Sequence, residues 1–79
     1  MKAKIYITLK PGVLDPQGKA VQHALGSLGF REVQDARIGK YIELALNGVD
    51  RSQAEADVKQ MCEKLLANTV IESYRYELE

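Results

Sequence analysis

The first ten residues alternate between apolar and polar side chains. Such alternation predicts a half-buried β-strand over residues 2–10. Its apolar face consists of Ala3, Ile5, Ile7 and Leu9. Pro11-Gly12 ends this strand. Asp15 and Pro16 then predict the start of a helix, because aspartate is a common N-cap and proline is tolerated in the first turn.

Two later segments repeat their apolar residues at helical spacing, and we expect both stripes to join the core. The first predicted helix spans residues 16–28, and its stripe is Ala20, Val21, Ala24, Leu25 and Leu28. The second follows Asn47-Gly48 and ends near Asn68, with the stripe Ala54, Val58, Met61, Cys62, Leu65 and Leu66. Either Asp50 or Ser52 caps its start. Gly18 and Gly26 weaken the first helix, so packing must hold it.

Residues 32–47 allow two interpretations. A hairpin turn at Gly39-Lys40 would set the charged Arg37 and Asp35 opposite the apolar Ile42 and Leu44. A single strand kinked or bulged near Gly39 keeps the apolar residues on one face, and we favour it. Such a strand would be about 50 Å long, which is more than one small domain can pair. We therefore expect part of it to contact a second copy of the chain.

The last segment, Thr69 to Glu79, alternates again, so the element order is β-α-β-α-β. This order predicts a single α+β domain over residues 1–79, related to the ferredoxin-like fold. We expect a two-layer sandwich in which both helices cover one face of an antiparallel sheet and the long middle strand is kinked near Gly39.

Composition narrows the function classes. Eleven basic and eleven acidic side chains give a net charge of zero, which disfavours nucleic acid as the main partner. A single cysteine excludes an internal disulfide. A chain with only one histidine and one cysteine also offers too few ligands for a typical zinc site. We find no transmembrane run and no signal peptide, and therefore expect a cytoplasmic protein without membrane contact. At 79 residues the core is small, so we expect a homodimer or tetramer.

No catalytic constellation is evident along the chain. His23 has no nearby acid or nucleophile, and Cys62 lies within an apolar stripe, where a thiol acts as a small hydrophobe. We predict no catalytic, cofactor-binding or metal-binding residue. Arg37, Gly39 and Lys40 form the most distinctive polar cluster, because two cations flank a glycine in the middle of a strand. They predict an anion-binding or subunit-docking site.

Several runs of sequence together resemble the PurS family over essentially the whole chain. They are Leu14-Asp15-Pro16-Gln17-Gly18, Leu28-Gly29-Phe30, the Arg37-Ile38-Gly39-Lys40 element, and the run from Met61 to Asn68 that continues in Val70-Ile71-Glu72. Thr69 departs from the family, which often has proline there. The resemblance implies the small subunit of the FGAM synthase (FGAR amidotransferase) complex of de novo purine biosynthesis.

In this family the small subunit is similar in role to a built-in domain of the single-chain enzyme, and the resemblance implies that this chain acts as an adaptor. It would bridge a glutaminase subunit (PurQ) and a large synthetase subunit (PurL) and support ammonia transfer, without catalytic residues of its own. The ligase complex uses ATP and Mg, and neither would be bound by this chain. The interface candidates are Arg37, Gly39, Lys40, Asn68 and Glu72. The alternative is a stand-alone dimeric module of ferredoxin-like or ACT-like type that binds a small regulatory ligand.

Overall fold

The computed structural model describes all 79 residues and contains three strands, two α-helices and one π-helical turn. In chain order the elements are β1 (Lys2–Leu9), α1 (Pro16–Ser27), β2 (Gly39–Ala45), α2 (Arg51–Met61), the π-helical turn η1 (Cys62–Leu66) and β3 (Glu72–Leu78). The strands form one antiparallel sheet in the order β2-β1-β3. The predicted α+β class is therefore confirmed.

The core lies between β1 and the second helix. Ala3, Ile5 and Ile7 on the central strand are fully buried, as their alternation predicts. α2 and η1 cover them through Val58 and Cys62, which are also fully buried. Apolar residues of β2 and β3, with Leu46 just after β2, pack around this centre and are only half-buried; those in the strands are Ile42, Leu44, Tyr74, Tyr76 and Leu78. The cysteine is thus a core residue, as expected.

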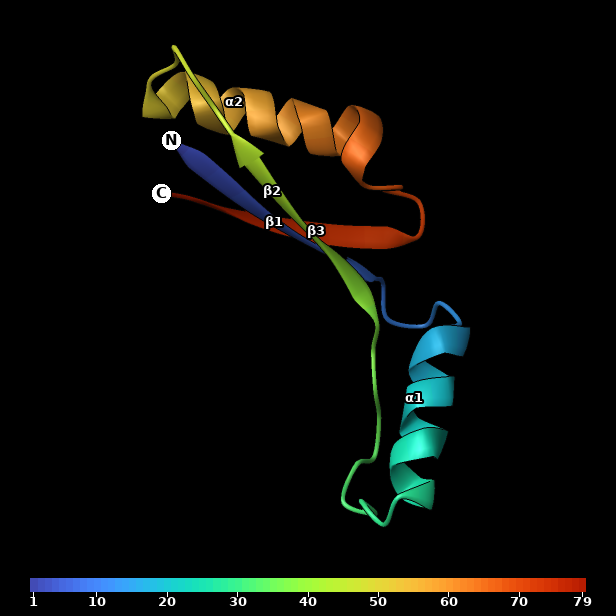
Figure 1. Cartoon of the computed structure of the whole chain (residues 1–79). Coiled ribbons are helices and arrows are strands. Elements are labelled where there is room, and N and C mark those ends of the chain that lie inside the picture. Colours follow the sequence, from blue (N-terminus) through green and yellow to red (C-terminus); the bar gives the residue numbers. More distant parts are fainter.

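The first helix lies away from the sheet. We expected both helices on one face, but α1 makes almost no contact with the strands or with α2 (Figure 1). It runs instead beside the extended segment 33–38, where the Gln22 side-chain amide donates to the carbonyl of Gln34 at 2.9 Å. Of the residues in α1, only Gly18 is buried. We call α1 and residues 28–38 together the arm.

The middle of the chain forms no hairpin at Gly39. The arm leads directly into β2, so the prediction of one continuous segment is confirmed (Figure 1). The expected strand over residues 32–47 is nevertheless too long, because only Gly39–Ala45 pairs with β1. Gly39 pairs with Thr8 near the end of β1, so the preceding residues have no neighbouring strand. The sheet simply ends there.

The arm gives the molecule an elongated shape. Its longest dimension is 49 Å, and its radius of gyration is 16.0 Å. A compact domain of this length has a radius of gyration of about 12 Å. Neither helix has the length or the apolar character of a membrane-spanning segment. Both helices begin at an aspartate cap, Asp15 for α1 and Asp50 rather than Ser52 for α2.

Candidate functional site

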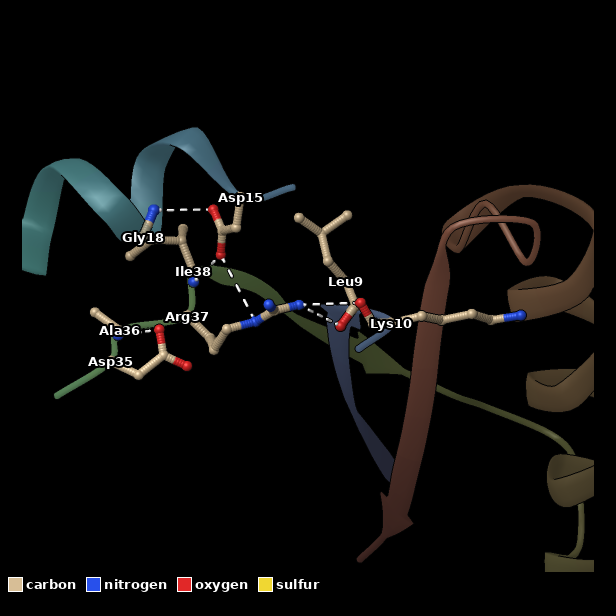
Figure 2. A network of polar contacts seen from close by, with 8 residues as sticks. All are labelled: Leu9, Lys10, Asp15, Gly18, Asp35, Ala36, Arg37 and Ile38. Atoms are coloured by element: carbon tan, nitrogen blue, oxygen red, sulfur yellow. Dashed lines mark hydrogen bonds and ion pairs between the residues drawn. The ribbon is translucent and has the colours of Figure 1, made fainter. Parts of the chain in front are cut away.

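Asp15 fastens the arm at its base. Its carboxylate is 7% exposed and accepts two backbone N–H groups, from Gly18 at 2.9 Å and from Ile38 at 3.0 Å (Figure 2). These hydrogen bonds, with the Arg37 guanidinium 3.9 Å away, lower the pKa of Asp15 below its usual range. The first bond caps α1, as predicted, and the second ties the helix to the chain 23 residues later.

Arg37 completes this attachment from the opposite side. Its Nη2 donates to the carbonyl oxygens of Leu9 at 2.9 Å and Lys10 at 3.1 Å, where β1 ends (Figure 2). Arg37 therefore holds the arm in its position relative to the sheet. The expectation that Arg37 takes part in an anion-binding or subunit-docking site stays a prediction, because its side chain is 37% exposed and only Nη2 makes these two hydrogen bonds within the chain.

Two glycines permit the close contacts around this attachment. A Cβ on Gly18 would collide with the carbonyl oxygen of Ala36, so a side chain there would push α1 off the extended segment. A Cβ on Gly39 would collide with the carbonyl oxygen of Ile7, at the point where β2 begins to pair. Neither position has room for a side chain, because backbone atoms lie directly against it.

The other predicted interface residues form a second cluster at the same end of the sheet. Lys40 lies 3.5 Å from a carboxylate oxygen of Glu72, across the central strand from it. The other Glu72 oxygen accepts the backbone N–H of Asn68 at 2.6 Å. Asn68 in turn organises the turn before β3, where its carbonyl accepts from Ile71 and Glu72. Lys40, Glu72 and Asn68, which belong to the predicted set of interface candidates, thus form one connected group.

A groove of about 310 Å³ lies between these clusters. Gly39, Lys40 and Glu72 line it, together with Asp15, Gln17 and other residues of β1 and α1. Asn68 adjoins the groove through Glu72, whereas Arg37 lies on the far side of Asp15. No group of three or more His, Cys, Asp or Glu side chains in the chain is arranged to hold a metal ion. The charged groups along the groove are the amine of Lys40 and the carboxylates of Asp15 and Glu72.

Sequence patterns alone missed the wider role of Asp15. Its position before Pro16 indicates a helix cap, which accounts for one carboxylate oxygen. Nothing nearby in the sequence indicates that the other oxygen binds Ile38. The only available signal is the close occurrence of Asp15 and Gly18 at a helix start, since a glycine in the first turn leaves room for another chain segment.

Comparison with known proteins identifies the family. The model of the family PurS, described as phosphoribosylformylglycinamidine (FGAM) synthase, matches residues 2–79. The phosphoribosylformylglycinamidine synthase subunit PurS of Bacillus subtilis (strain 168) is 64% identical over 78 residues, which cover 99% of this chain and 92% of that protein. The chain belongs to the PurS family. The PurS of Methanocaldococcus jannaschii, 41% identical over 99% of the chain, extends the family likeness to an archaeal protein.

Solved structures of PurS proteins share the whole fold, including the arm. A crystal structure of B. subtilis PurS matches with a TM-score of 0.88 at 64% identity and covers 99% of this chain and 96% of that one. A chain in the structure of PurLQS from Thermotoga maritima also has a TM-score of 0.88, at 32% identity, covering 96% and 93% of the two chains. Since nearly every residue is aligned, the extended posture of the arm recurs in PurS chains.

Proposed function

We propose that this chain is the adaptor subunit of an FGAM synthase. It would join a large synthetase subunit of the PurL type to a glutaminase subunit of the PurQ type in purine biosynthesis. The observation that carries this proposal is its full-length match to a chain in the PurLQS structure of T. maritima. The elongated body, 49 Å in its longest dimension, supports it because an adaptor needs separated surfaces.

The chemistry of ammonia explains why such an enzyme complex needs an adaptor. Ammonia near neutral pH is mostly protonated and then cannot act as a nucleophile, so it must travel between active sites without equilibrating with water. A small rigid subunit can hold two active sites in register without contributing a catalytic group. In this proposal the chain has no catalytic residue, ATP and Mg are held by the complex, and the chain works in the cytoplasm with its partners.

Residues around the groove are the proposed contacts with the partner subunits. Lys40, Glu72 and Asn68 are connected to one another and lie at one end of the sheet, with Gly39 between them and the arm. Arg37 contributes indirectly in this proposal, by fixing the arm beside the groove. Charged groups at the rim of an interface set orientation and the rate of association more than total affinity.

Light scattering coupled to size exclusion tests the proposal directly. The chain is mixed with the large and glutaminase subunits, in the presence of ATP, Mg²⁺ and glutamine. We expect one peak whose mass requires all three chains, and we expect the two larger subunits to associate poorly when this chain is omitted. A complex of the two larger subunits that forms equally well without it would contradict the adaptor role.

A further inference from the structure

The turn between β2 and α2 contains an Asn-Gly pair that the adaptor proposal does not use. Asn47 and Gly48 are both exposed in the short connection that joins the two elements. The side chain of Asn47 makes no hydrogen bond within the chain, and the backbone N–H of Gly48 makes none either. Both the side-chain amide of the asparagine and the peptide nitrogen that follows it are therefore open to water.

Glycine is required at the second position of this pair. Gly48 has a φ of 73°, which lies in the left-handed region that residues with a side chain rarely adopt. No atom beyond its chain neighbours lies within 4 Å of the place where its Cβ would be, so the space around the turn is open. The conformation that turns the chain therefore also leaves the peptide nitrogen after Asn47 unshielded.

The residues on either side of the pair are held firmly. The Leu46 N–H donates to the Met1 carbonyl at 2.8 Å, and the Leu46 carbonyl accepts from the amino terminus at 3.2 Å. Asp50 caps α2 by accepting the Gln53 N–H at 2.8 Å. Only residues 47–49 lie between these two attachments. A covalent change within this link therefore leaves β2 and α2 attached at both of its ends.

Asn68, the only other asparagine in the chain, is in the opposite situation. Its side-chain oxygen accepts the Val70 N–H at 3.2 Å, and its own backbone N–H donates to the Glu72 carboxylate at 2.6 Å. The next residue is Thr69, whose β-branched side chain crowds the peptide nitrogen between the two residues. The chain thus contains a free asparagine followed by glycine and a restrained asparagine followed by a β-branched residue.

We propose that Asn47 is a site of spontaneous deamidation and that the contacts of Asn68 protect that residue from the same reaction. The Gly48 nitrogen loses its proton to base and attacks the side-chain carbonyl carbon of Asn47. The new C–N bond closes a succinimide ring, while the bond to the side-chain nitrogen breaks and that nitrogen takes up a proton and leaves as ammonia. The reaction needs no enzyme, oxidant or cofactor. It concerns this chain alone and does not depend on the adaptor function.

Water opens the ring and completes the modification. It adds to either carbonyl of the succinimide, so the residue becomes aspartate or isoaspartate, and the side-chain amide has been exchanged for a carboxylate. The parent chain has a formal net charge of zero, so the product carries an additional negative charge and can be separated from the parent by ion exchange. In the isoaspartate form, the backbone between Leu46 and Asp50 is also longer by a single carbon atom.

Incubation of the pure, folded chain in mildly alkaline buffer tests the proposal. Peptide mapping by mass spectrometry follows both asparagines in the same molecules, and isoaspartyl methyltransferase labels the isoaspartate product. We expect Asn47 to be converted at least about tenfold faster than Asn68, because its neighbour is glycine rather than a β-branched residue. Asn47→Gln should suppress the charge change, because its longer side chain closes a ring far more slowly. No conversion at Asn47, or equal conversion of the two asparagines, would overturn the proposal.

Thr69→Gly separates the effect of the neighbouring residue from that of the fold. This variant has Asn-Gly at both places, and both should react at similar rates when the chain is unfolded in guanidinium. In the folded variant, confirmed as folded by far-UV circular dichroism, the hydrogen bonds of Asn68 are retained. We therefore expect Asn68 to react at least about tenfold more slowly than Asn47 there. Equal rates in the folded variant would show that these contacts give no protection.

Discussion

The carboxylate of Asp15 binds the backbone N–H of Ile38 at 3.0 Å and so joins the start of α1 to the start of β2. This contact and the hydrogen bonds of Arg37 to the end of β1 together hold the arm in its position. The Asp15 side chain is 7% exposed and lies between two backbone N–H donors and a guanidinium. A negatively charged carboxylate suits this place because all three neighbours attract it. The attachment also decides which surfaces of the chain remain available to other molecules.

Acidification should release the arm. Because the folded chain lowers the pKa of Asp15, its contribution to stability is fully present above the usual value of 3.8 and is lost as the pH falls through the lower folded value. At neutral pH the Asp15 carboxylate is ionised, so its contribution to stability is fully present. Hydrogen exchange at the Ile38 amide, measured as a function of pH and corrected for intrinsic rates, should show protection that declines below about pH 4.

Asp15→Asn separates the two roles of this side chain. Asparagine caps helices as well as aspartate does, but its amide nitrogen cannot accept the Ile38 N–H. We expect α1 to keep its cap and the Ile38 amide to exchange about tenfold faster or more. If Ile38 protection is the same in this variant as in wild type, the carboxylate does not hold the arm.

Two alanine substitutions in α1 should have opposite signs. Gly26 has nothing within 4 Å of its missing side chain, so Gly26→Ala should stabilise the chain by about 0.5–1 kcal/mol through helix propensity. Gly18→Ala has the same propensity gain but collides with the carbonyl of Ala36, and should destabilise by about 1–3 kcal/mol. Urea unfolding measures both. A stabilising Gly18→Ala would show that α1 does not pack closely on the extended segment.

Arg37 and Lys40 should differ although both were predicted as docking residues. Arg37→Ala removes two hydrogen bonds to backbone carbonyls and should lower stability by about 1 kcal/mol, with faster exchange in α1. Lys40→Ala removes one exposed ion pair with Glu72 and should cost less than about 0.5 kcal/mol. On the adaptor proposal, the lysine variant nevertheless binds the partner subunits more weakly. Equal stability losses for the two variants would contradict this division of roles.

Cys62 should resist alkylation in the folded chain. Its side chain is fully buried, and burial raises the pKa of its thiol, so little thiolate is available. We expect iodoacetamide at pH 8 to label it only after unfolding in guanidinium. The double variant Met61→Cys/Cys62→Ala is the positional control, because Met61 is 37% exposed and its replacement should react readily. Comparable labelling of both thiols in folded protein would place Cys62 outside the core.

The elements of the fold could be predicted because they rest on local patterns. Alternation at Ala3, Ile5 and Ile7 places β1 correctly, and helical spacing from Ala54 to Cys62 places α2. The position of α1 could not be predicted in the same way. Its apolar stripe indicates burial, yet apart from the half-buried Leu25 the stripe is exposed, because Asp15 and Arg37 hold the helix away from the sheet. Apolar periodicity predicts a helix with an apolar face, but it does not say whether the rest of the same chain covers that face.

The candidate site was predicted in part for a similar reason. The sequence places Gly39 and Lys40 together because they are neighbours, and the sheet register then brings Glu72 opposite them. Arg37 has the same charge and a similar position, but its role depends on where β1 ends. That role requires the three-dimensional arrangement of residues 28 positions apart, which no local pattern contains.

On the adaptor proposal, this chain connects two active sites rather than performing chemistry itself. The most direct test compares two sources of nitrogen in reconstituted FGAM synthase, with and without this chain. Glutamine must pass its ammonia between subunits, whereas ammonium salt at high concentration reaches the synthetase from solution.

We predict that omitting the chain abolishes glutamine-dependent FGAM formation and leaves ammonia-dependent formation by the large subunit largely unchanged. Glutaminase activity, followed as glutamate release, is measured in parallel to see whether it also depends on the assembled complex. Loss of the ammonia-dependent reaction to the same extent as the glutamine-dependent one would mean that the chain takes part in the chemistry of the synthetase site, and would contradict the adaptor role.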